Sequence, residues 1–168
     1  MRFLILIILS IIAVQFPYNT ALACYSPLQA EAEKALRFQA EVMVISLYCK
    51  RSAAGGVRYA PPDEGNRHYY AFRKNTREIL SEYEQIMLEY YRDNGSRVPE
   101  KNLDYLRSGF SNDIAAKAAR MDRSTFCRDN YKTLVRASKM QAADLKNLAF
   151  SSVGDNPSSV RICAQKGY

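Results

Sequence analysis

The sequence predicts an all-α protein, an up-down-up-down four-helix bundle with a long first connection and a disulfide-tied C-terminal tail. Apolar residues recur at spacings of three and four over four long stretches, which is the pattern of helices packed on one face. The second and third connections are short, which favours antiparallel neighbours. Four cysteines lie close to the expected helix ends. Together these observations predict the bundle.

The first 23 residues are expected to be a secretory signal peptide. Arg2 gives a positive start, residues 3–14 are apolar, and Ala21-Leu22-Ala23 fits an A-x-A cleavage site. The alternative is an uncleaved membrane anchor, but the apolar run is shorter than the ~20 residues that a spanning helix needs. We therefore expect cleavage after Ala23 and no transmembrane segment in the mature chain.

The mature chain is long enough for one domain. We expect a single helical domain over 24–168, with the bundle in 24–150 and the tail in 151–168. Without the leader, which holds one arginine and no acidic residue, the net charge falls from +7 to +6. A mildly basic balance favours anionic surfaces such as lipid headgroups or acidic polymers. The basic residues are spread along the chain, however, as they are on ordinary solvated helix faces.

The first helix is predicted over 28–49, and the other helices should pack around it. Ser26 can cap it, Pro27 suits the first helical position, and Gln29 completes a capping box with Ser26. The run 42–45 is apolar on every side, as in a helix surrounded by protein, so the second half should form the centre of the core. The core-facing stripe is expected at Leu28, Ala32, Ala35, Leu36, Met43 and Leu47.

The second helix is predicted over about 67–94, after a long connection punctuated by Gly55-Gly56 and Pro61-Pro62. It should stop at Asn94-Gly95, because both residues tolerate left-handed backbone. Asn94 also begins an N-glycosylation sequon, and the sequence leaves its use open. The packed seam follows a 3-4 spacing for three heptads and comprises Tyr69, Phe72, Thr76, Ile79, Tyr83, Ile86 and Tyr90.

The third helix can start at Pro99, and the fourth near Ser124, a favourable cap. The stripe of the third helix is Leu103, Leu106, Phe110, Ile114, Ala118 and Met121. The fourth helix is expected to run to about Phe150 and to bury Cys127, Tyr131, Leu134, Leu145 and Leu148. The loop-like stretch SSVGDNPSS then leads to the last cysteine.

Four cysteines in an exported chain predict two disulfides. The up-down order places Cys24 and Cys163 at one end of the bundle. It places Cys49 and Cys127 at the other end. Bridges within each end are therefore expected, because the two other pairings would have to run along a helix at ~1.5 Å per residue, against a limit of about 7 Å between Cα atoms. Cys24 would begin the mature chain, as in a bacterial lipoprotein; the residues before it fit that signal poorly, and its lipidation stays open.

Three segments resemble a group of small exported bacterial proteins of unknown function: RFQAEVMVISLYC, HYYAFRKNTREILSEYEQIMLEYYRDNG and FSNDIAAKAARMDRSTFC. The similarity covers about 24–130. Its motifs are a helix that ends in Cys49, a Tyr69–Phe72 pair that opens the next long helix, and Phe126-Cys127. The resemblance implies a bacterial periplasmic protein with Cys49 paired to Cys127. It implies no activity and no ligand.

An enzyme with a site near His68 is the sharpest functional hypothesis. His68 is the one histidine of the chain, and it fits no zinc spacing with the cysteines. No G-x-S-x-G motif accompanies it. The sequence therefore gives no catalytic residue, no metal ligand and no cofactor.

A non-catalytic binding or envelope-associated module, secreted or periplasmic, is the hypothesis that we favour. A basic surface module that binds anionic polymer or membrane is a further alternative. Nucleic acid is not expected as a partner, because several tyrosines of the helix 67–94 occupy seam positions and should be buried. The candidate ligand or surface contacts are His68, Tyr70, Arg73 and Arg77.

Overall fold

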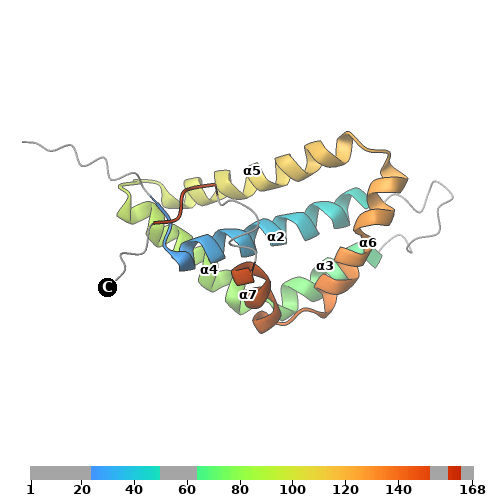
Figure 1. Cartoon of the computed structure of the whole chain (residues 1–168), viewed down its shortest axis with the longest axis horizontal. Coiled ribbons are helices and arrows are strands. Elements are labelled where there is room, and N and C mark those ends of the chain that lie inside the picture. The colour runs from blue at the N-terminus through green and yellow to red at the C-terminus, as the bar shows by residue number, and fades with distance from the viewer. Residues whose placement is uncertain (1–23, 50–63, 152–158, 164–168) are drawn as a thin grey trace, which may run out of the picture.

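The computed structural model describes residues 24–49, 64–151 and 159–163, and the expected signal peptide lies outside them. The described residues are helical apart from short connections, the residues before α2 and the segment 159–163 (Figure 1). Their helices are α2 (Pro27–Cys49), α3 (Glu64–Asn75), α4 (Arg77–Asp93), α5 (Pro99–Ala119), α6 (Arg123–Lys139) and α7 (Ala142–Ser151). Among the described helices, none is both long enough and apolar enough to cross a lipid bilayer.

Helix α2 is the element on which the others pack. It contacts α3, α4, α5, α6 and α7, and Figure 1 shows it between α5 on one side and α4 and α7 on the other. Residues 30–36 are buried without exception, so this part of α2 is enclosed on all sides. The second half of α2 was predicted to form the centre of the core, but the buried core also includes residues 30–36 of its first half. The two ends of the predicted stripe were wrong, because Leu28 is 47% exposed and Leu47 is 60% exposed.

The start of α2 confirms the predicted capping box. The backbone N–H of Gln29 donates to Ser26 Oγ at 3.2 Å, and the N–H of Ser26 donates to Gln29 Oε1 at 2.8 Å. Pro27 is the first helical residue, where a missing N–H costs nothing. These local bonds fix where α2 begins and hence where Cys24 lies.

The predicted second helix is two helices, α3 and α4, which meet at Thr76. The Thr76 hydroxyl donates to the Phe72 carbonyl at 2.7 Å inside the core, a back-bond that bends helices. The predicted seam is otherwise correct, since its members are either buried or packed against the core. The predicted stop is also correct: Gly95 has φ +80° and is the left-handed residue after α4.

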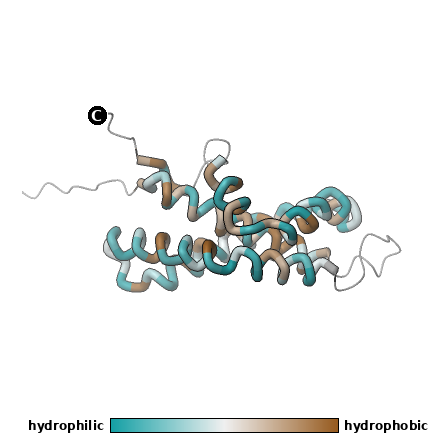
Figure 2. The backbone as a smooth tube through the Cα atoms, turned by 90° about the horizontal axis from the view of Figure 1, so that it is seen from below, coloured by the Kyte–Doolittle hydropathy of each residue, from teal (hydrophilic) through white to brown (hydrophobic). Residues whose placement is uncertain are grey.

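The predicted fourth helix is likewise two helices, α6 and α7. Asp122, and not Ser124, caps α6, because its carboxylate accepts from the Thr125 backbone N–H at 3.1 Å. The chain leaves the helical conformation at Met140, whose backbone is extended and whose side chain is buried. The N–H of Gln141 then donates to Asp144 Oδ2 at 2.9 Å and starts α7. Figure 2 shows hydrophilic residues along much of the tube, with short hydrophobic stretches among them.

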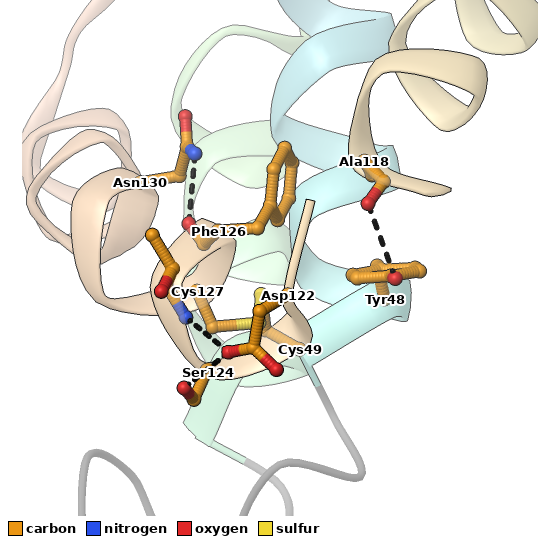
Figure 3. The surroundings of a disulfide bond; sticks show 9 residues. Tyr48, Cys49, Ala118, Asp122, Ser124, Phe126, Cys127 and Asn130 are labelled. Carbon is orange, nitrogen blue, oxygen red and sulfur yellow. Dashed lines mark hydrogen bonds between the residues drawn. A yellow bond between two sulfur atoms is a disulfide. The ribbon is translucent and has the colours of Figure 1, made fainter. Parts of the chain in front are cut away.

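Two disulfides hold the chain at opposite ends of α2. Cys49 is bonded to Cys127, with Cα atoms 5.5 Å apart, beside the α6 cap (Figure 3). At the other end Cys24 is bonded to Cys163, with Cα atoms 5.1 Å apart. A parallel bridge reinforces the second bond: the Tyr25 N–H donates to the Arg161 carbonyl, and the Cys163 N–H donates to the Tyr25 carbonyl, each at 2.8 Å. These are the pairings that the sequence analysis derived.

Candidate binding site

The four candidate contacts from the sequence occupy α3 and the start of α4. The His68 ring is partly buried and stacks edge-on against Tyr131 of α6, with centroids 6.0 Å apart. Tyr70 is 69% exposed, and Arg73 is partly buried. Arg77 lines a shallow hollow of about 520 Å³ on α4, which none of the other three residues lines.

Another group of polar residues, which the sequence analysis did not single out, lies on the buried half of α2. We refer to Glu31, Glu33, Lys34 and Arg37 as the α2 charge cluster. Its first three members are at most 6% exposed, an unusual burial for side chains that are mostly found in water. Buried charges need partners. The contacts of each member therefore show which charges of the cluster are paired and which are not.

The Glu33 carboxylate is fully buried and is held by the C-terminal tail. It accepts from the Ser159 hydroxyl at 2.6 Å and from the Ser159 backbone N–H at 2.9 Å. Arg37 Nη2 lies 3.2 Å from the same carboxylate, and the Arg37 guanidinium lies 4.3 Å from the Phe110 ring centroid. Glu33 therefore has several donors, and the tail that the Cys24–Cys163 disulfide anchors supplies two of them.

Glu31 is held by Tyr83 of α4. The Tyr83 hydroxyl donates to Glu31 Oε1 at 2.5 Å, and both side chains are buried. Burial raises the pKa of Tyr83 above its ordinary value, and the negative Glu31 raises it further. Tyr83 therefore stays protonated and acts as the donor.

Lys34 differs from these two acids. It is 5% exposed, and its Nζ has no hydrogen-bond partner among the described residues. Burial lowers the pKa of Lys34, and the positive charge of Arg37 lowers it further, whereas Glu33 acts in the opposite direction. Arg37 Nε is also buried without a partner among those residues. The cluster thus has satisfied acceptors and unsatisfied donors.

The basic members of the cluster lie in a pocket between α2 and α7, which we refer to as the α2–α7 pocket. Its volume is about 150 Å³, and it is lined by Lys34, Ala35, Arg37, Phe38, Glu41, Leu145, Leu148 and Ala149. Burial raises the pKa of Glu41, while Lys117 opposes this effect. The pocket therefore combines an apolar lining with basic and acidic side chains.

A wider hollow of about 530 Å³ lies between α6 and α7 and shares Leu148 with the α2–α7 pocket. Arg136, Lys139 and Asp144 supply its charges, and the first two are exposed and solvated. Neither hollow contains His68. Within the described part of the chain no group of histidine, cysteine and acidic side chains is arranged to hold a metal ion.

A sequence signal for the α2–α7 pocket does exist. Lys34, Arg37 and Glu41 are spaced at three and four residues, so they share one helix face. A charged stripe is normally a solvated face, and this one is covered because α7 packs against α2. The spacing alone does not distinguish a solvated charged face from one that another helix covers.

The chain matches no protein-family model, no curated protein and no solved structure. The resemblance to small exported bacterial proteins therefore stays a prediction.

Proposed function

We propose that this chain is an exported, non-catalytic helical protein that acts by binding, as a periplasmic or envelope-associated module. The observation that carries the proposal is the pair of disulfides at opposite ends of α2. Structural disulfides form and persist in oxidising compartments and are rare in the cytosol. The signal-like leader, which lies outside the described residues, supports the same route.

The proposal includes an up-down-up-down course in four arms. α2 and α5 are the first and third arms, whereas α3 with α4 and α6 with α7 form the bent second and fourth arms. The two disulfides support this order, because each joins cysteines that it brings to the same end.

Export is tested by expressing the full chain in a bacterium and measuring the intact mass of the product in each compartment. The proposal expects a periplasmic chain that begins at Cys24 and has all four cysteines in disulfides. A diacylglyceryl adduct on Cys24 would support the lipoprotein alternative. A full-length, reduced chain that stays in the cytosol would overturn the proposal.

The competing enzyme hypothesis is tested through His68. Its partly buried ring against Tyr131 is the arrangement of a packed side chain. A hydrolase screen on the purified protein should show no turnover. Turnover that is lost in His68→Ala, with the fold intact, would favour the enzyme. Crosslinking in the envelope fraction, followed by identification of the partner, tests binding directly.

A further inference from the structure

The α2–α7 pocket has two chemically different ends. Lys34 is at one end of the stretch of α2 that lines it, Glu41 is at the other, and Arg37 lies midway between them. Glu41 is seven positions after Lys34, which is about 10 Å at ~1.5 Å per residue. Phe38 lies between them, and Leu148 is one of three apolar residues that α7 contributes. Along α2 the lining therefore runs from Lys34, through Arg37 and Phe38, to Glu41.

The basic side chains of the pocket have hydrogen-bond donors without acceptors. Lys34 Nζ and Arg37 Nε are both withheld from solvent and have no partner among the described residues. A buried polar group without a partner costs free energy, and a charged one costs more. An anion in the pocket would supply the missing acceptors and offset that cost.

We infer that the α2–α7 pocket binds a carboxylate on a short apolar chain, with the carboxylate at Lys34 and Arg37 and the chain against Phe38 and Leu148. The small volume suits a small ligand, since sites for drug-sized molecules are larger, about 300–1,000 Å³. Glu41 at the far end disfavours a second negative charge and so selects against dicarboxylates. The inference rests on the proposed function in one respect, namely that the protein binds its ligand without converting it.

The first experiment compares four ligands of equal chain length on the purified, oxidised protein by calorimetry and NMR. Hexanoate should bind saturably and raise the melting temperature, because a ligand that binds the native state stabilises it. Hexanol lacks the charge, hexylamine carries the opposite charge, and adipate carries two carboxylates, so each should bind more weakly. Equal binding of hexanol and hexanoate, or no binding of hexanoate, would overturn the inference.

The second experiment replaces the buried ammonium and leaves the fold intact. Lys34→Met keeps a long apolar stem and removes the charge, and it should weaken hexanoate binding about tenfold or more, the usual effect of losing a hydrogen bond to a charged group. Its melting temperature without ligand should be unchanged or higher, because a buried, unpaired charge is removed. Lys146→Met, on an exposed position of α7, is the matched control and should bind like the parent protein. Unchanged affinity in Lys34→Met would contradict the inference.

The third experiment tests the acidic end of the pocket. Glu41→Gln should improve adipate binding relative to hexanoate, because the repulsion of the second carboxylate is removed. An unchanged ratio would show that Glu41 does not set the selectivity.

An acetylated dipeptide that ends in leucine distinguishes the source of the carboxylate: its binding at the same site assigns a peptide C-terminus, and its exclusion assigns a free aliphatic acid. A protein that is exported and oxidised but binds no carboxylate refutes this inference and leaves the proposed function standing.

Discussion

At the scale of single residues, the most unusual feature is a helix that buries two acids and a lysine within four positions. Glu31 and Glu33 each have a specific partner, Tyr83 and Ser159, from distant parts of the chain. A buried pair is strongly destabilising to break, even where a hydrophobic replacement of the whole pair would be neutral. These contacts therefore fix which surfaces of α4 and of the tail face α2.

Tyr83→Phe should lower the free energy of unfolding by about 1–3 kcal/mol, because it leaves the buried Glu31 carboxylate without this donor. Tyr105→Phe is the control, since Tyr105 is 66% exposed and should have almost no effect. Urea unfolding followed by circular dichroism measures both. Equal effects of the two substitutions would show that the Tyr83–Glu31 bond contributes little.

The buried tyrosines predict a loss of stability at high pH. Burial raises the pKa of both Tyr25 and Tyr83, whereas a tyrosine in the unfolded chain titrates near pH ~10. Above that pH the unfolded chain releases protons that the native chain retains, so the free energy of unfolding falls as the pH rises.

Urea midpoints between about pH 8 and about pH 11 measure this fall. Tyr25→Phe should make the dependence shallower, and Tyr105→Phe should change it less because Tyr105 is exposed. The lowered pKa of Lys34 acts in the opposite direction. As the pH rises, the buried ammonium loses its proton in the native chain before the same lysine does in the unfolded chain, so this residue makes the free energy of unfolding rise. Repeating the series in Lys34→Met separates the two contributions.

At the scale of elements, the start of α2 and the end of α4 were predicted correctly because local chemistry sets both. Ser26 and Gln29 form a reciprocal cap, and Gly95 supplies the left-handed residue, so the sequence alone indicated both ends. The breaks at Thr76 and Met140 were missed, because neither follows a glycine or proline. Both side chains are buried, and the breaks allow α3 with α4, and α6 with α7, to bend around α2.

The α2–α7 pocket was not predicted, for a related reason. Lys34 and Arg37 lie in a stretch whose composition is that of a solvated helix face, and they are covered because α7 packs against α2, while the tail covers Glu33. Both covering segments are distant in sequence, and neither carries a motif that indicates where it packs. The disulfide pairing was predictable, in contrast, because helix lengths restrict which cysteines can meet.

The cap of α6 gives a prediction at this scale. Asp122 accepts from the Thr125 backbone N–H and from the Ser124 hydroxyl, and these bonds, led by that of Ser124, lower the pKa of Asp122. Asp122→Ala should therefore lower the melting temperature more than Ser124→Ala does. The difference should be present near neutral pH and should disappear as the pH falls through the lowered pKa, because the protonated carboxyl accepts less well. A larger effect of Ser124→Ala would restore Ser124 as the cap.

At the scale of the whole molecule, stability depends on α2 because every other helix of the described residues packs on it. The disulfides hold this helix at both ends, each to a segment that lies far away in the sequence. Removal of the Cys49–Cys127 bridge should release the start of α6. Removal of the Cys24–Cys163 bridge should instead release the tail that covers Glu33.

Cys49→Ser should be strongly destabilising. The bridge to Cys127 spans 78 positions, for which chain-entropy estimates give about 4.5 kcal/mol as an upper value, comparable to the total stability of a small domain. Thermal unfolding and thiol labelling measure the loss and the newly free Cys127. Peptide mapping without reductant provides the control on pairing, and recovery of Cys24 linked to Cys49 would contradict the structure.

The Cys24–Cys163 bond makes the chain between these residues a covalent ring, and Cys49–Cys127 is a chord across it. A single cut at the exposed Gly95 lies inside both loops, so residues 24–95 and 96–163 remain joined twice after cleavage. A protease that nicks this turn would leave one molecule on a non-reducing gel and two fragments only after reduction. For the same reason the turn at Gly95 suits new chain termini: a circular permutant opened there, with its former ends linked across Cys24 and Cys163, keeps each of the helices α2 to α7 whole.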